Sequence, residues 1–198
     1  MGITFAIFKD NFIQASLGIF EKSKEIIVAP GANTQMLWTL IPLLAGLIFL
    51  EIYFGHYKRE ELGWNSAVSN SLVLFFVGMS LFSYLSAEGG MAYLSFVGGF
   101  NIIGSGVMIT KTAIAAFVAL EGVLLFALNF AHALPKKFAF GISSGFFLNF
   151  LGLIAIILVY GSIEFNFYIL PAVLLIFLCL VIILGLIEAI EPAQWHSK

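Results

Sequence analysis

"AVSNSLVLFFVGMSLFSYLSA", residues 67–87, contains no charged side chain from one end to the other. A helix needs about 20 consecutive apolar residues to cross roughly 30 Å of hydrocarbon, so this stretch is long enough to cross a bilayer. Further apolar runs of similar length lie before and after it. The expected spans are residues 35–55, 66–87, 112–134, 141–162 and 168–190. The sequence therefore predicts an all-α fold, a polytopic integral membrane helix bundle with about five transmembrane helices.

The composition agrees with this prediction. Hydrophobic residues make up 61% of the 198 residues and charged residues 10%, and the mean hydropathy is +1.07. So few polar side chains cannot cover a water-soluble globule, and membrane lipids are the expected surroundings. The net charge of -2 includes no basic excess, so no nucleic acid is expected as a partner. Cys179, the single cysteine, lies in the last apolar run and is expected to be a small buried side chain, and no metal site or cofactor is predicted.

A different pattern precedes the first span. Across residues 3–27, one set of side chains falls on a single side of a helix, namely Phe5, Phe8, Phe12, Ala15, Ile19, Ser23 and Ile26. The opposite side carries Asp10, Gln14, Glu21 and Glu25. This pattern is typical of a helix in the headgroup plane. We therefore predict an N-terminal interfacial amphipathic helix over residues 1–30 and a single transmembrane domain over residues 31–198. The alternative is a soluble amphipathic helix packed on a partner.

The segment between the second and third spans is rich in glycine and reads "GGMAYLSFVGGFNIIGSGVMITK" from residue 89 to residue 111. Irregular backbone at membrane depth is tolerated only where protein or water receives its amides, so residues 89–110 are predicted to form a re-entrant loop or a broken segment. Its backbone carbonyls and small side chains would form the outer constriction of a pathway, at Gly98, Gly99, Asn101, Gly104, Ser105 and Gly106. A broken sixth membrane helix is the alternative.

Charged residues between the spans indicate the orientation. With five crossings, the loops at 55–65 and 135–140 share one side of the membrane, and each brings two cations. The positive-inside rule places that side in the cytoplasm, with the N-terminus outside and the C-terminus cytoplasmic in a cell membrane. Lys22 and Lys24 favour the reverse. The two loops together form a predicted cytoplasmic charged collar of Lys58, Arg59, Glu60, Glu61, Lys136 and Lys137. A solvated loop that only sets the topology is the alternative.

Glu121 is the one charged residue that interrupts the third span. It lies about nine residues from the start of that span, or roughly 13 Å at 1.5 Å per residue, which places it near the middle of the bilayer. A charge at this depth costs on the order of 3 kcal/mol, so such residues usually face a bundle interior or water. Glu121 is therefore a candidate functional residue. The alternative is a neutral carboxyl group that hydrogen-bonds to another helix as a structural contact.

Other polar side chains have depths in the inner half of the bilayer, namely Asn70, Asn129, Asn149, Glu51 and His132. Polar groups in lipid need partners, so we expect these side chains to share one polar layer with Glu121. That layer is either dry and interlocked or open to cytoplasmic water.

No catalytic site is predicted. The sequence "GISSG" at 141–145 matches the pattern of a nucleophile elbow, but it begins a predicted membrane helix instead of following a strand. The hypothesis for function is passage of a proton, a small cation or a small solute through a cytoplasm-facing polar cavity that ends at Glu121. The alternative is a non-transporting structural or assembly subunit of a larger membrane complex. In either case the expected partners are further copies of the chain or other membrane subunits.

Overall fold

The computed structural model describes residues 2–56, 63–88, 92–95 and 101–190, and the all-α prediction is confirmed. The long helices are α1 (Gly2–Val28), α2 (Thr34–His56), α3 (Trp64–Ala87), α4 (Gly106–Phe130), α6 (Gly145–Tyr160) and α7 (Ile169–Ile190). The short elements are the 3-10 helix η1 (Ala29–Ala32), the helix α5 (Lys136–Ile142) and the strands β1 (Tyr93–Ser95) and β2 (Asn101–Ile103).

The lengths of these helices confirm an integral membrane helix bundle. Four segments are long and apolar enough to cross a bilayer, namely Trp64–Ala87, Gly106–Phe130, Lys136–Tyr160 and Ile169–Leu186. A fifth is obtained when Lys9–Ala32 and Thr34–Phe49, which are bent by 106° at the break between them, are taken as one span. The structure therefore supports residence in a membrane, whereas the cell membrane and the orientation of the termini stay predictions.

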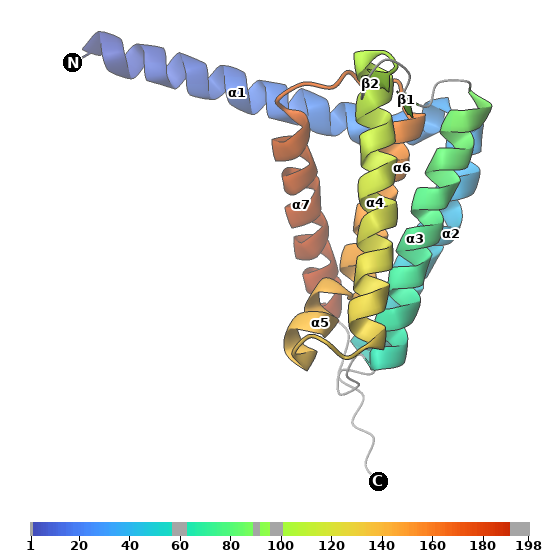
Figure 1. Ribbon diagram of the computed structural model, residues 1–198. Coiled ribbons are helices and arrows are strands. Elements are labelled where there is room, and N and C mark those ends of the chain that lie inside the picture. The colour runs from blue at the N-terminus through green and yellow to red at the C-terminus, as the bar shows by residue number, and fades with distance from the viewer. Residues whose placement is uncertain (1, 57–62, 89–91, 96–100, 191–198) are drawn as a thin grey trace.

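The helices α2, α3, α4 and α6 run side by side, while α1 lies across one end of them (Figure 1). We name this end the α1 end, and the opposite end, where α3 begins and α4 finishes, the α5 end. Successive membrane helices alternate in direction, so α2, α4 and α7 all run from the α1 end toward the α5 end (Figure 1). Most of the hydrophobic core lies between α2, α3, α4 and α6.

Glycines bring α3 and α4 into close contact. A Cβ atom added to Gly78 would lie 2.6 Å from the backbone nitrogen of Ala119, and one added to Gly122 would lie 2.4 Å from that of Phe75. Small residues are typical of membrane helix interfaces because no hydrophobic force drives helices together in lipid, and close packing has to replace it. This pair fixes the rotation of α4, with Ala115, Val118 and Leu125 on its buried side.

The glycine-rich segment differs in detail from the prediction. Its described residues include the antiparallel strands β1 and β2, which lie at the α1 end (Figure 1). The prediction that the third span begins at residue 112 was wrong, because α4 already begins at Gly106. The Ser105 side chain caps this helix by accepting a hydrogen bond from the Met108 backbone N–H at 3.3 Å. Ser105 and Gly106 therefore start a helix, and the re-entrant placement of the segment stays a prediction.

The fourth span is broken near the α5 end. Helix α5 ends at Ile142, and α6 begins at Gly145, with the Ser144 side chain accepting a hydrogen bond from the Phe147 backbone N–H at 3.3 Å. The N-cap interrupts the helix because its own backbone is extended, with φ -61° and ψ 140°. The break leaves Ser143 between the two helices, fully buried.

Candidate functional site

Asn129 is the centre of a buried polar cluster near the α5 end. Its side chain is 0% exposed, and its Nδ2 donates hydrogen bonds to Ser71 Oγ at 3.0 Å and to Ser143 Oγ at 2.7 Å. A longer contact of 3.4 Å runs from the same nitrogen to the Ala67 carbonyl oxygen. One amide thus connects α3, α4 and the break between α5 and α6.

Two further hydrogen bonds close the cluster. Asn70 Nδ2 donates to the Ser143 carbonyl oxygen at 2.9 Å, and Ser71 Oγ donates to the Ala67 carbonyl oxygen at 2.7 Å. We name Asn70, Ser71, Asn129 and Ser143 the Asn129 cluster. Ser71 and Ser143 are also 0% exposed, so Asn129 and these two serines form a buried group whose members are joined by hydrogen bonds. Within the described chain, only Asn129 Oδ1 of this cluster is buried without a hydrogen-bond partner.

Sequence reasoning placed Asn70 and Asn129 in one layer but missed Ser71 and Ser143. Both serines lie one helical turn after a fully buried alanine, Ser71 after Ala67 and Ser143 after Ala139. A small residue one helical turn from a serine is the sequence pattern that could have identified these two positions. Ser143 belongs to the "GISSG" stretch, where it serves as a hydrogen-bond acceptor between helices.

Glu121 lies two helical turns before Asn129, about 12 Å away along α4. Its side chain is half-buried, at the border of the buried side of the helix. One carboxyl oxygen, Oε2, is buried and has no hydrogen-bond partner among the described residues. Leu125, between Glu121 and Asn129, is only 6% exposed, so apolar packing separates the acid from the Asn129 cluster.

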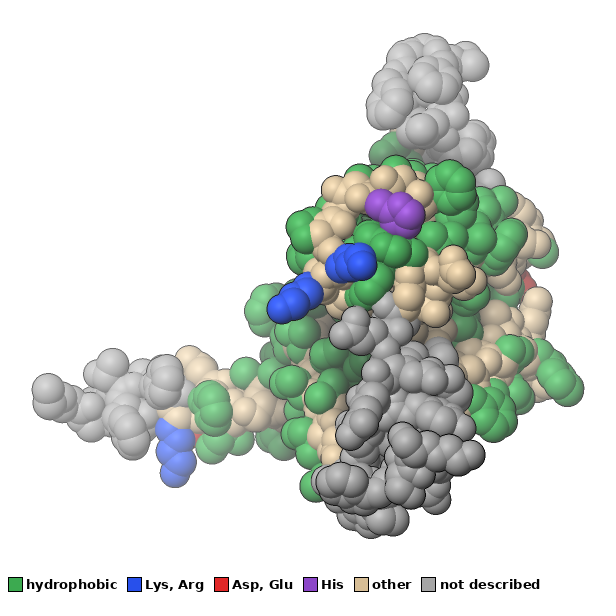
Figure 2. All heavy atoms as spheres, turned by 90° about the horizontal axis from the view of Figure 1, so that it is seen from below, with side chains coloured by type: hydrophobic (Ala, Val, Ile, Leu, Met, Phe, Trp, Pro, Cys, Tyr) green, Lys and Arg blue, Asp and Glu red, His purple; other side chains and the backbone are tan. Residues whose placement is uncertain are grey.

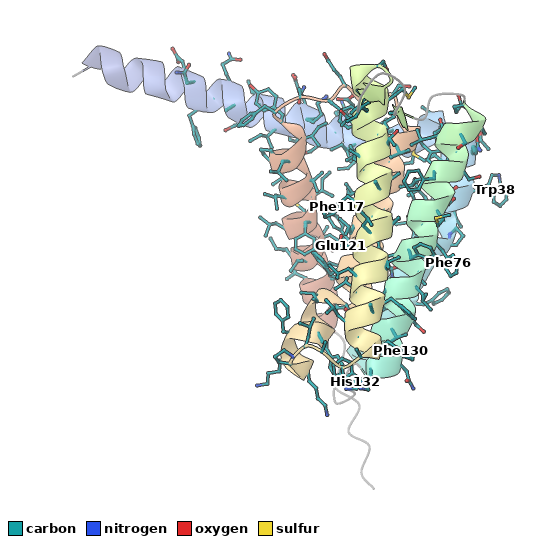
Figure 3. The ribbon with its side chains drawn as sticks, viewed as in Figure 1. Trp38, Phe76, Phe117, Glu121, Phe130 and His132 are labelled. Carbon is teal, nitrogen blue, oxygen red and sulfur yellow. The ribbon has the colours of Figure 1, made fainter. Side chains whose placement is uncertain are left out.

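The surface of α4 beside Glu121 is apolar and open. Phe117 is 60% exposed and Leu124 is 58% exposed, and both share the side of α4 next to Glu121. In Figure 3, Phe117 and Glu121 project from the middle of α4 toward the side on which α7 stands. Helix α7 packs on the bundle along one side only and leaves the other side exposed, and Cys179, which was expected to be buried, is exposed on it.

Asn149 and His132 do not join the Asn129 cluster. Asn149 is half-buried on α6 and makes no hydrogen bond with any residue that the structure describes. His132 is exposed at the α5 end, where its ring meets that of Trp64 edge to face at a centroid distance of 4.2 Å. It ends α4 in a left-handed conformation with φ 49°, and the Ala133 N–H then bonds the Leu128 carbonyl oxygen at 2.9 Å.

The charged collar is described only in part. Lys136 and Lys137 are exposed at the start of α5, and the view from the α5 end shows basic and histidine side chains on this surface (Figure 2). Four collar residues lie outside the described residues, namely Lys58, Arg59, Glu60 and Glu61. The same holds for Gly98 and Gly99 of the expected constriction and for the side chain of Glu51.

The described residues contain no group of three or more His, Cys, Asp or Glu side chains that could hold a metal ion. Comparison of the chain with protein-family models, curated proteins and solved structures finds no match.

Proposed function

We propose that this protein is a non-transporting integral membrane subunit that assembles with another membrane-spanning chain through the Glu121 side of α4. The position of the Glu121 carboxyl group supports the proposal most directly, since its side chain is half-buried beside an exposed apolar strip of α4 and makes no hydrogen bond with the described residues. Leaving a buried polar atom unpaired costs about 1–3 kcal/mol. A neighbouring transmembrane helix that offers a donor at this depth would pair with Oε1, the carboxyl oxygen that the protein leaves accessible, and would remove that cost for it.

The surroundings of Glu121 suit a helix as the partner. Phe117 and Leu124, next to the acid, leave an apolar strip on α4 exposed. Apolar side chains around one polar contact are typical of helix association in membranes, where packing supplies area and the polar group fixes register. The partner we expect carries a neutral side chain that can donate a hydrogen bond to a carboxyl or amide oxygen, such as Asn or Gln.

The competing proposal is passage of a proton, cation or small solute through a cytoplasm-facing polar cavity that ends at Glu121. Such a path requires polar groups that are free to exchange partners and meet water. Asn129, Ser71 and Ser143 are instead 0% exposed and bonded to one another, and Leu125 separates them from the acid. The geometry therefore gives assembly more support than transport.

Two substitutions at Glu121 separate these functions. Glu121→Gln keeps an acceptor and removes the ionisable proton, whereas Glu121→Leu removes both. Native mass spectrometry of the complex extracted from its own membrane in mild detergent reports assembly, and proton or cation flux in proteoliposomes reports transport. Glu21→Gln, at an exposed position on α1, is the matched control.

Assembly predicts that Glu121→Leu weakens the complex while Glu121→Gln and Glu21→Gln preserve it. One interhelical hydrogen bond in a membrane contributes about 0.6–1.7 kcal/mol, so association should weaken roughly 3- to 18-fold. Flux should equal that of protein-free vesicles for every variant. Flux by the parent protein that Glu121→Gln abolishes would establish transport instead, and an unchanged complex in Glu121→Leu would remove the basis of the assembly proposal.

A further inference from the structure

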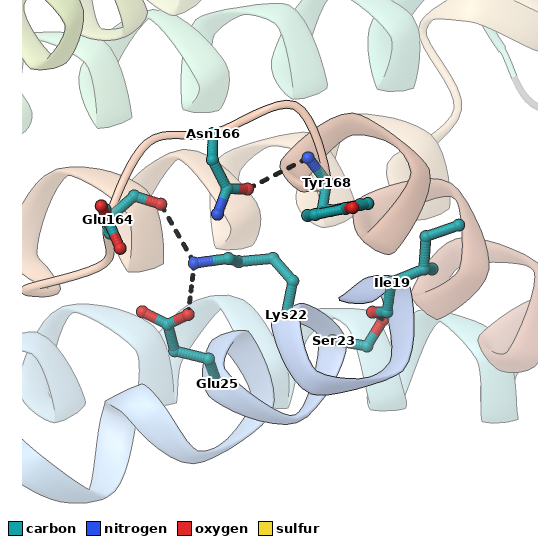
Figure 4. Close-up of polar contacts among 7 residues, drawn as sticks. All are labelled: Ile19, Lys22, Ser23, Glu25, Glu164, Asn166 and Tyr168. Atoms are coloured by element: carbon teal, nitrogen blue, oxygen red, sulfur yellow. Dashed lines mark hydrogen bonds and ion pairs between the residues drawn. The ribbon is translucent and has the colours of Figure 1, made fainter. Parts of the chain in front are cut away.

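The C-terminal half of α1 is fixed to the start of α7 and to the connection that precedes it. Lys22 is only 7% exposed, and its Nζ donates to a Glu25 carboxylate oxygen at 2.5 Å and to the Glu164 carbonyl oxygen at 3.1 Å (Figure 4). The ring of Tyr168 packs on Gly18 so closely that an added Cβ atom would lie 2.8 Å from it. These contacts attach α1 to the first turn of α7.

Two more residues complete the attachment. Ile26 is 1% exposed and joins an apolar cluster with Ile154 of α6 and Ala172 of α7. Ser23, also buried, lies with its hydroxyl 3.5 Å from the Ala172 carbonyl oxygen. The buried side of α1 therefore points toward the bundle along this half of the helix.

The position of α7 sets the depth of α1. Helix α7 has 22 residues and is about 33 Å long at 1.5 Å per residue, close to the thickness of the hydrocarbon layer. Its first turn therefore lies at the boundary between acyl chains and headgroups. Because α1 contacts that first turn and is bent by 106° from α2, it lies flat at the same level.

The N-terminal half of α1 continues at this level beyond α7, where none of the described elements lies beneath it (Figure 1). Phe12 is 65% exposed there, although its angular position on the helix is close to that of the buried Ile26 and Ser23. Phe12 thus lies on the same side of α1 as Ile26 and Ser23, which contact the rest of the protein in the C-terminal half of the helix. Asp10, also exposed, lies on nearly the opposite side.

We propose that the N-terminal half of α1 is a lipid-binding arm, with Phe12 inserted at the headgroup–acyl boundary of the leaflet beside α7. The occupant is the bilayer itself, because the arm continues the α1–α7 interface at the depth where lipid surrounds α7. Leu170 at the start of α7 is 68% exposed at the same level. Lys9, also exposed, is placed to meet anionic headgroups.

Spin labels test the arm directly. Phe12→Cys and Asp10→Cys are each made in a Cys179→Ala background, labelled, and reconstituted into vesicles of phosphatidylcholine with phosphatidylglycerol. Collision with oxygen, which concentrates in acyl chains, is compared with collision with a water-soluble nickel chelate. Leu178→Cys on the exposed side of α7 and Lys137→Cys at the α5 end supply the lipid and water references.

The label at Phe12 should have an oxygen-to-nickel ratio at least about threefold above that at Asp10 and should approach the Leu178 reference. A Phe12 ratio equal to the Lys137 reference would place the arm in water and overturn the proposal. Spin–spin broadening at Phe12 that disappears on dilution with unlabelled protein would also overturn it, because a second copy would then cover this side chain.

Discussion

Replacing Asn129 with leucine tests the buried cluster at its centre. The substitution keeps the approximate volume of the side chain but removes both short hydrogen bonds, to Ser71 at 3.0 Å and to Ser143 at 2.7 Å. Interhelical hydrogen bonds in membranes contribute about 0.6 kcal/mol on average and up to about 1.7 kcal/mol each. The substitution also removes Asn129 Oδ1, which is buried without a hydrogen-bond partner, and this offsets part of the cost. The Ser143 hydroxyl, which loses its hydrogen bond to Asn129, adds to the cost. We expect a net loss of about 1–3 kcal/mol in the free energy of unfolding.

The assay is equilibrium unfolding in mixed micelles, followed by circular dichroism as denaturing detergent is added. Asn149→Leu is the matched control, because Asn149 makes no hydrogen bond with a described residue, and it should change stability by less than about 0.5 kcal/mol. In a double-mutant cycle, Asn129→Leu and Ser143→Ala should show a coupling of about 1 kcal/mol. Equal effects of the two leucine substitutions, together with zero coupling, would refute the account of the cluster.

Three further predictions use the same unfolding assay or proteolysis. Gly122→Ala should lower the free energy of unfolding by about 1–3 kcal/mol, because the added Cβ atom would meet the Phe75 backbone. Gly46→Ala is the control and should be neutral or slightly stabilising, because nothing lies within 4 Å of an added Cβ atom there. Similar values for the two variants would contradict the close α3–α4 contact. His132→Val should lower the free energy of unfolding by at least about 1 kcal/mol more than His132→Asn, because asparagine tolerates a positive φ and a β-branched residue does not. Equal losses would contradict the left-handed conformation at the end of α4. Lys22→Met should speed protease cleavage within α1 several-fold, and the exposed Lys24→Met should leave the rate unchanged; the reverse order would exclude Lys22 as an anchor.

The sequence predicts the membrane helices well because each span is a long apolar run and hydropathy alone reveals it. The third span was placed six residues late at its start, because Gly106 and the residues after it read as loop although Ser105 caps a helix there. The break at Ser143 was also missed, since the residues around it are apolar or small and compatible with a continuous helix.

For the candidate site, the sequence predicts how far along its helix each residue lies but not which way its side chain points. The position of a residue along a helix follows from the sequence, so Asn70 and Asn129 were predicted to share one layer, and both side chains hydrogen-bond to Ser143. Rotation about the axis does not follow from the sequence when apolar residues surround the helix. Asn149 and His132 lie at neighbouring depths, yet neither side chain bonds the cluster within the described structure. The rotation of α4 depends on Gly78 and Gly122, whose partners belong to other helices.

Photocrosslinking from Phe117 tests most directly whether the Glu121 side of α4 contacts another chain. Phe117 is 60% exposed one turn before Glu121, and Phe76 on α3 is 63% exposed and serves as the control position. A benzophenone amino acid at Phe117, irradiated in native membranes, should give a defined protein adduct that Glu121→Leu abolishes and Glu121→Gln retains. Adducts with lipid alone, or a protein adduct that persists in Glu121→Leu, would contradict the account.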